Sequence, residues 1–192
     1  REQSKDTLCR SNLHSVYLAT LTYLQDYKYF SELNNEPDDG SWQYNYLIYD
    51  SRDFDQNFGP LVDDGRNLGT VETLFCPRQT DPYHSFATAE NPWPERPLYS
   101  DTSAGNGRKN QLTGRSIDQF RGNPAIMADV FHLPKVVRSA HKTGINAVHL
   151  GGDVHWVPDT GFLTDNELTR PFQPEDNDLM ENIWDKITRG GQ

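Results

Sequence analysis

The sequence predicts an α+β fold, and three features of the chain lead to that class. Apolar residues recur every three or four positions near the N-terminus, which is typical of an amphipathic helix. Two short β-type runs late in the chain flank a Gly-Gly turn, which indicates a hairpin. Strands and helices do not alternate, so a doubly wound parallel sheet is excluded. With 192 residues, the chain is expected to form one domain over residues 1–192.

The first element is a helix over residues 4–30, within a helical segment of residues 1–32. The polar stretch at residues 34–40 contains Pro37 and Gly40, which cannot extend a helix. The buried stripe of this helix is expected to consist of Cys9, Leu13, Val16, Thr20, Leu24 and Tyr27.

The first strands are expected within residues 42–76, at residues 44–49 and 70–75. The second run alternates as a strand does and ends where Pro77 removes a donor. Residues 78–120 are expected to be a long irregular loop inserted in a small sheet. Loops of this length often carry a function, and exposed Pro92, Trp93 and Pro94 would serve partner binding there.

Residues 124–158 hold the clearest β-structure. A buried strand is expected at residues 125–131, followed by a hairpin of residues 146–150 and 153–157. Val148 and Leu150 are expected on one side of it, and Val154 and Trp156 on the inner side of the returning strand. The last element is a helix over residues 177–187, within residues 176–188.

Charge and hydropathy limit the function. The formal net charge is −10 without a basic patch, so nucleic acid is excluded as a partner. The longest apolar run is about four residues, Ala125 to Ala128, far below the ~20 needed for a membrane span. Because the chain begins at Arg1 without Met, we expect a processed or truncated fragment.

The two cysteines, Cys9 and Cys76, form no Cys-x-x-Cys pair. They are either joined in one long-range disulfide or present as two unrelated buried thiols, and of these alternatives we favour the disulfide.

The segment that most resembles a chemical site is residues 149–155. Asp153 and His155 lie two apart on a strand and share a face, as the ligands of metallophosphoesterases do. The alternative function is therefore a metal-dependent phosphoesterase that uses these two residues, with His149 or Asp129. A dinuclear centre needs further Asp-x-His ligands, which are missing, so a polar outer hairpin face is the favoured interpretation.

The other motifs are weaker indications of a function. Ser139 and His141 form no catalytic triad, and no Gly-x-Ser-x-Gly motif occurs. Residues 105–109 lack the Gly-Lys-Ser/Thr ending of a phosphate loop and are expected to be a flexible loop tip. The acidic loops at residues 38–39, 50–55 and 63–64 lack EF-hand spacing and are expected to be solvated turns. A carbohydrate-binding module would use Trp42, Trp93 and Trp156.

Four motifs in order carry a family resemblance. Residues 9–13 match Cys-x-x-Asn-Leu, residues 75–78 resemble Phe-x-Cys-Pro-Ser with Arg78 in place of Ser, and residues 126–131 match a central strand. Residues 141–157 resemble a His-x-x-Gly-x-Asn signature followed by Asp-Gly-His-Val, although here the order is Gly-Gly-Asp-Val-His. The chain thus resembles the prepilin-type cleavage and methylation family, in its pseudopilin-like, planctomycete-type group.

The resemblance implies a pilin-like fold, in which an N-terminal helix packs on an antiparallel sheet. It implies a non-enzymatic structural subunit that assembles with copies of itself and with other pilin-like subunits. The assembly would be a pseudopilus or a type IV pilus-like filament, and type II secretion is one process that such a filament serves. The chain would be the periplasmic or cell-surface head of an inner-membrane-anchored precursor, whose N-terminal membrane helix has been removed.

For individual residues, the resemblance implies a Cys9–Cys76 disulfide between helix and sheet, and helix packing by Asn12 and Leu13. No cofactor is expected, although related pseudopilins hold calcium near the C-terminus, where this chain has Asp153, Asp159 and Asp165 without a matching ligand pattern. The hairpin signature consists of His141, Gly144, Asn146, Gly151, Gly152, Asp153 and His155.

Overall fold

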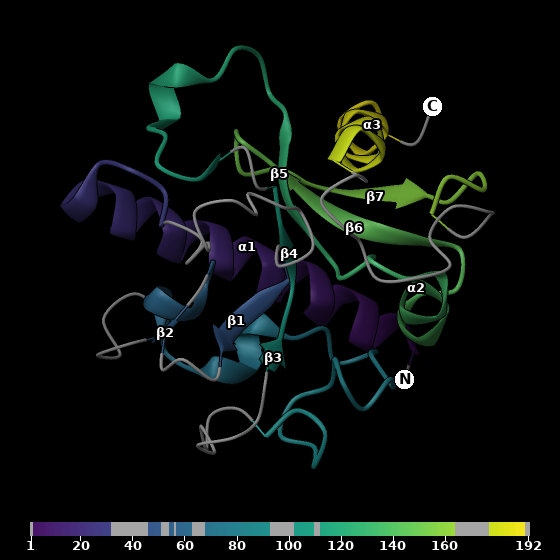
Figure 1. The fold of residues 1–192 in the computed structure, drawn as a ribbon. Coiled ribbons are helices and arrows are strands. Elements are labelled where there is room, and N and C mark those ends of the chain that lie inside the picture. The colour runs from purple at the N-terminus through teal and green to yellow at the C-terminus, as the bar shows by residue number, and fades with distance from the viewer. Residues whose placement is uncertain are drawn as a thin grey trace.

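One long helix, α1 (Glu2–Tyr27), packs against two small antiparallel sheets in the computed structural model (Figure 1). The structure describes residues 2–31, 46–50, 54–55, 57–62, 68–92, 102–109, 112–163 and 177–190. Within these ranges, no helix is both long and apolar enough to cross a bilayer. The α+β class, the N-terminal helix and its antiparallel sheet partner are therefore confirmed.

The two sheets have different strand orders. The first sheet has the order β2-β1-β3, and the second has the order β4-β5-β6-β7, with every neighbouring pair antiparallel. The strands are β1 (Leu47–Asp50), β2 (Phe54–Asp55), β3 (Thr102–Ala104), β4 (Gly107–Arg108), β5 (Ala125–Ala128), β6 (Gly144–His149) and β7 (Val154–Pro158), and the other helices are α2 (Pro134–Ala140) and α3 (Asn177–Thr188). The predicted late hairpin and C-terminal helix are thus present.

The second sheet is covered on both faces. On the side that we call the α1 face, Val148 of β6 packs in one core with Leu13 and Val16 of α1. On the opposite side, the α3 face, Ala147 and Val157 pack in a second core with Trp184 of α3. Because both faces are occupied, every residue of β6 is buried.

The stripe of α1 is largely as predicted. Cys9, Leu13, Val16 and Thr20 are buried. Tyr27 is exposed, which contradicts the prediction, because α1 ends there and Lys28 adopts a positive φ of 66° that turns the chain away.

Residues 70–75 do not form the predicted strand. They form a 3₁₀ turn, η4 (Val71–Leu74), because the Thr70 hydroxyl accepts a hydrogen bond from the Glu72 amide and starts the turn. The turn packs under α1, where Asn12 Nδ2 donates to the Phe75 carbonyl at 3.0 Å.

Residues 78–120 are not wholly an irregular insertion, because they supply β3 and β4. The expectation of a flexible tip at residues 105–109 is also wrong. The Gly105 amide donates to Tyr46 O, the Asn106 amide to Leu74 O, and the Lys109 amide to Ile126 O, all at 2.9 Å. These bonds tie the segment to the residue before β1, to η4 and to β5, so it is a hydrogen-bonded crossing between β3 and β4 rather than a loop tip.

Two further differences concern the C-terminal half. The central strand β5 ends at Ala128 rather than at residue 131. The seven-residue helix α2, which the sequence analysis did not predict, follows with Pro134 at its start. It is too short for a helical period to stand out.

Trp156 is not an inner residue of the hairpin. Its side chain is 41% exposed, whereas its neighbour Val157 is fully buried on the α3 face. Only Val154, nearer the turn, packs against the α1 core from that side. Trp156 instead lies against Gly144, and its ring meets the edge of His141 at 5.6 Å between centroids.

Candidate functional site

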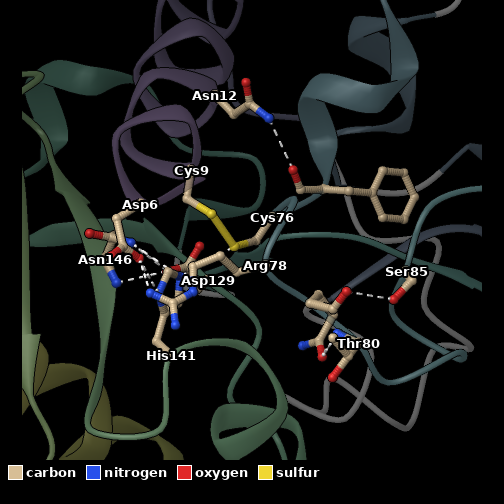
Figure 2. Close-up of a disulfide and its surroundings, with 12 residues drawn as sticks. Asp6, Cys9, Asn12, Cys76, Arg78, Thr80, Ser85, Asp129, His141 and Asn146 are labelled. Carbon is tan, nitrogen blue, oxygen red and sulfur yellow. Dashed lines mark hydrogen bonds and ion pairs between the residues drawn. A yellow bond between two sulfur atoms is a disulfide. The ribbon is translucent and has the colours of Figure 1, made fainter. Parts of the chain in front are cut away.

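A disulfide fastens α1 to the segment that follows η4. Figure 2 shows Cys9 of α1 bonded to Cys76, and both residues are buried. The two Cα atoms lie 4.9 Å apart, within the range usual for disulfides. Because 67 positions separate the cysteines, the bond closes a long loop. The pairing that the family resemblance implies is therefore the pairing in the structure.

His141 lies directly beside this disulfide. Its Nε2 atom is 3.2 Å from Cys76 Sγ and 3.1 Å from Asp129 Oδ2, and its Nδ1 atom is 3.2 Å from Asp6 Oδ1. The imidazole thus sits between two carboxylates, one from α1 and one from the end of β5 (Figure 2).

Asn146 of β6 holds the Asp129 carboxylate in place. Its amide N and its Nδ2 atom donate to Asp129 Oδ2 at 2.8 and 2.9 Å, and the Asp129 amide donates back to Asn146 O at 3.0 Å. The Asp129 carboxylate thus accepts the hydrogen bond from the Asn146 amide at the point where β5 has ended. This explains why a His-x-x-Gly-x-Asn pattern occurs here: the histidine and the asparagine bind the same buried carboxylate.

Arg78 completes the group from the other side. Its Nη1 atom donates to Asp6 Oδ1 at 2.6 Å. Partial burial acts to raise the pKa of Asp6, but the hydrogen bonds and charges of Arg78 and His141 outweigh it and lower this pKa. We call Asp6, Arg78, Asp129, His141 and Asn146, together with the disulfide, the His141 cluster.

Two positions of the hairpin signature require glycine, because neighbouring atoms leave no room for a Cβ atom. A Cβ atom on Gly144 would lie 2.3 Å from Val157 O, and one on Gly152 would lie 2.6 Å from Tyr17 Cε1. Gly152 also has a φ of +92°. The Tyr17 hydroxyl donates to Leu150 O at 2.7 Å, so the hairpin turn is docked on α1.

Asp153 and His155 of the signature form a second group on the α3 face, together with His149. His149 Nδ1 lies 3.7 Å from Asp153 Oδ2, and His155 Nε2 contacts the same oxygen. Asn123 Nδ2 donates to Asp153 Oδ1 at 3.0 Å, while its Oδ1 accepts from the Gly151 amide at 2.6 Å. We call His149, Asp153 and His155 the His149 cluster.

The pKa of Asp153 is lowered despite partial burial, which acts to raise it. The hydrogen bonds from Asn123 and His155 and the nearby His149 ring favour the ionised carboxylate. The nearby Asp153 charge adds to burial in raising the pKa of Tyr17. Asp153 is therefore the anionic centre of the His149 cluster.

The structure divides the predicted signature between the two faces. His141 and Asn146 meet on the α1 face, whereas Asp153 and His155 meet on the α3 face, because residues of odd and even number alternate along β6 and β7. Sequence reasoning missed Asp6, Arg78 and Asn123 as cluster residues. Their partners lie 30 or more positions away in the chain, so no local pattern indicates them.

Several other candidates take ordinary structural roles. Ser139 Oγ donates to Val136 O at 2.8 Å, its other hydrogen bond being to Gln79, so it does not face His141. Asp159 Oδ1 accepts from the amides of Gly161 and Leu163, as a turn residue does. Trp42, Trp93, Pro94, Asp165 and the acidic residues at 38–39 and 63–64 lie outside the described residues.

Among the described residues, two groups bring possible metal-ligating atoms within 4.8 Å of one another: Cys9, Cys76 and His141, and the His149 cluster. In the first group both sulfur atoms are used by the disulfide, which leaves neither a nucleophile nor a thiolate ligand. The His141 cluster therefore fastens the fold, and of these two groups the His149 cluster is the one in which no covalent bond uses a possible ligand atom.

Comparisons of the chain with models of known protein families, with curated proteins and with solved structures find no match. The resemblance to prepilin-type proteins thus rests on the four sequence motifs, and the fold and clusters above are described on their own physical terms.

Proposed function

We propose that this chain is the pilin-like head of an exported, membrane-anchored subunit that assembles into a pseudopilus or related filament. The observation that carries the proposal is the packing of one face of the 26-residue helix α1 across an antiparallel sheet. A helix held in this way can act as the rigid spine of a subunit while its other face remains open to neighbouring subunits.

The fastening of α1 supports a mechanical role. The Cys9–Cys76 disulfide, the Asp6 contacts to Arg78 and His141, and the Asn12 bond to Phe75 O all join its first half to the body of the domain. Arg10 Nη2 adds a bond to Val154 O at 2.9 Å. Tension applied along α1 would therefore be transmitted through these contacts to the body of the domain, and α1 would stay attached.

The disulfide also supports export. Disulfides persist in the periplasm and outside the cell, whereas cytosolic thiols are kept reduced. The proposal thus includes a cell-envelope location and a membrane helix that precedes residue 1 in the precursor.

The outer face of α1 is the proposed assembly surface. Leu18 is exposed near the middle of the helix, on the side opposite the buried Leu13 and Val16. In an assembled filament such a leucine would be buried against the next subunit, which would offset its exposure in the isolated chain.

A phosphoesterase is the alternative, and the structure brings together only part of its ligands. His149 joins Asp153 and His155, but Asp129 belongs to the His141 cluster on the other face. Three ligands suit one ion, whereas a two-metal centre needs more. We therefore propose a structural subunit without catalytic activity.

The proposal is tested on the full-length protein in the organism that encodes it. Mass spectrometry of the protein from membranes and sheared filaments is expected to find a processed, N-methylated N-terminus. A photoreactive residue at position 18 is expected to give a ladder of self-crosslinked products. The same residue at the exposed Tyr83, which is remote from α1 in sequence, serves as the matched control and is expected to give none. An unprocessed cytosolic protein without crosslinks would contradict the proposal.

A further inference from the structure

The His149 cluster has the composition of a transition-metal site. It consists of two imidazoles and one carboxylate, and its ligand atoms lie within 4.8 Å of one another. His149 ends β6, Asp153 directly precedes β7 and His155 is the second residue of β7, so the hairpin itself brings the three together. Sets of two histidines and one carboxylate are typical of Zn²⁺ and related divalent ions with an open coordination position.

The His149 ring is oriented as a metal ligand is. Its Nε2 atom lies 3.4 Å from the carbonyl oxygen of Thr188, at the end of α3, and a carbonyl can only accept. A proton on Nε2 satisfies this carbonyl, and in that tautomer Nδ1 carries the lone pair that a metal ion needs. The His149 side chain is only 8% exposed, and its Nδ1 atom has no hydrogen-bond partner. The unpartnered nitrogen faces Asp153 Oδ2 at 3.7 Å.

The Asp153 carboxylate is held in place by a hydrogen bond to one of its two oxygen atoms. Asp153 Oδ1 accepts from Asn123 Nδ2, and Asn123 is itself fixed by the Gly151 amide. This leaves Oδ2 directed toward both imidazoles. Outer contacts of this kind orient the ligands in metal centres.

The distances need little adjustment to accept an ion. Two ligands that are each about 2.0–2.1 Å from a tetrahedral Zn²⁺ lie roughly 3.3 Å from each other. His149 Nδ1 and Asp153 Oδ2 are at 3.7 Å. His155 lies closer to Asp153 and would have to draw back, which its 58% exposed side chain permits.

We propose that His149 Nδ1, Asp153 Oδ2 and His155 Nε2 together bind one divalent transition-metal ion, with Zn²⁺ as the representative. The exposed side of Asp153 and His155 lets the ion enter without unfolding and leaves one position for water. The bound ion would join the end of β6 to the start of β7. The inference is independent of the proposed filament function.

The test is a titration of the protein with ZnCl₂, followed by calorimetry and by the NMR signals of the histidine rings. The protein carries no affinity tag and no reductant is present, so that the disulfide keeps Cys9 and Cys76 from binding zinc. We expect one ion per chain and shifts of the His149 and His155 rings. His155→Ala and Asp153→Asn are each expected to weaken binding at least about tenfold, the lower end of what even outer-shell partners contribute.

The control is His14→Ala, which removes an exposed histidine of α1 outside the cluster. It is expected to leave zinc affinity unchanged. Asp153→Asn keeps the side-chain shape, so a loss of binding by that variant is not a failure to fold, which circular dichroism checks. The proposal is overturned if wild-type protein shows no saturable 1:1 binding, or if His155→Ala and Asp153→Asn both bind zinc as the wild type does.

Discussion

The two histidine clusters on opposite faces of the second sheet differ in what surrounds the ring. On the α1 face, the two nitrogens of His141 lie 3.1 and 3.2 Å from the carboxylates of Asp129 and Asp6, beside a disulfide and the Arg78 guanidinium. On the α3 face, His149 Nδ1 lies farther from its carboxylate neighbour, 3.7 Å from Asp153 Oδ2, and that carboxylate is half-exposed. One short stretch of the sequence thus contributes to a closed structural group on one face and to the proposed metal site on the other.

The disulfide is expected to contribute most to the α1 face. Closing a loop of 67 residues stabilises the fold by about 4 kcal/mol in the chain-entropy model. Cys9→Ser/Cys76→Ser is therefore expected to lower the free energy of unfolding by about that amount in urea denaturation. A loss below about 1 kcal/mol would show that α1 is held without it.

Asp129 is expected to be the next largest contributor. Asp129→Ala removes the partner of the buried His141 ring and leaves Asn146 Nδ2 without its acceptor. Breaking a buried pair costs about 3 kcal/mol or more. Asp118→Ala, at an exposed carboxylate, is the matched control and is expected to change stability by about 0.5 kcal/mol at most. Equal effects of the two substitutions would contradict a structural role for the His141 cluster.

The docking of the hairpin turn on α1 is tested by Gly152→Ala. The new methyl group would meet the Tyr17 ring and occupy a positive φ, with an expected loss of about 2–3 kcal/mol. Gly122→Ala has a similar φ of +73° but nothing within 4 Å of the added atom. Its expected loss is only about 1 kcal/mol. The difference between the two variants, measured by thermal unfolding, isolates the contact with Tyr17.

Two histidines outside both clusters, His132 and His84, give the stability of the fold a pH dependence. Burial, with the charges of His84 and Lys135, lowers the pKa of His132 well below its usual value of 6.5, and burial lowers the pKa of His84. The unfolded chain therefore binds more protons, and stability is lost as pH falls below about 6.5, by up to about 1.4 kcal/mol per pH unit for each histidine. The lowered pKa values of Asp6 and Asp153 act only below pH 4.

His132→Phe keeps the stacking on Tyr46, whose ring centroid lies 4.0 Å away, and removes the titrating group. Denaturation at pH 7.0 and 5.5 is expected to show a smaller loss in the variant than in the wild type. An unchanged pH slope would assign the acid sensitivity to other groups.

The smallest effect on stability is expected in the His149 cluster. His155→Ala changes an exposed side chain and is expected to alter the free energy of unfolding by about 0.5 kcal/mol or less without metal. We also expect no hydrolysis of a simple phosphoester with or without zinc or manganese. Turnover that Asp153→Asn abolishes would favour the phosphoesterase alternative.

The elements with regular periodicity could be predicted from the sequence, and those formed by distant pairing could not. The stripe of α1, the hairpin and α3 follow from local patterns. By contrast, β4 at Gly107–Arg108 exists only because it pairs with Met127 and Ala128, and its own residues are typical of a loop. Residues 70–75 show the reverse case, since their alternating pattern was overridden by the Thr70 cap and by packing under α1.

The candidate site, too, could be predicted from the sequence only in part. His141, Asn146, Asp153 and His155 were selected from their spacing, but the side chains that decide their roles come from elsewhere in the chain. Asp6 contacts His141 and is itself held by Arg78, and the Thr188 carbonyl contacts the ring of His149. A linear pattern cannot indicate which face of a strand each of these partners will cover.

The most direct test of the account is the state of Cys9 and Cys76 in protein taken from its native cells without reductant. Intact mass with and without alkylation, followed by peptide mapping, measures it. The account predicts no alkylation before reduction and one linked peptide pair that joins Cys9 to Cys76. Two free, alkylatable thiols would contradict the fastening of α1 and, with it, the exported pilin-like head.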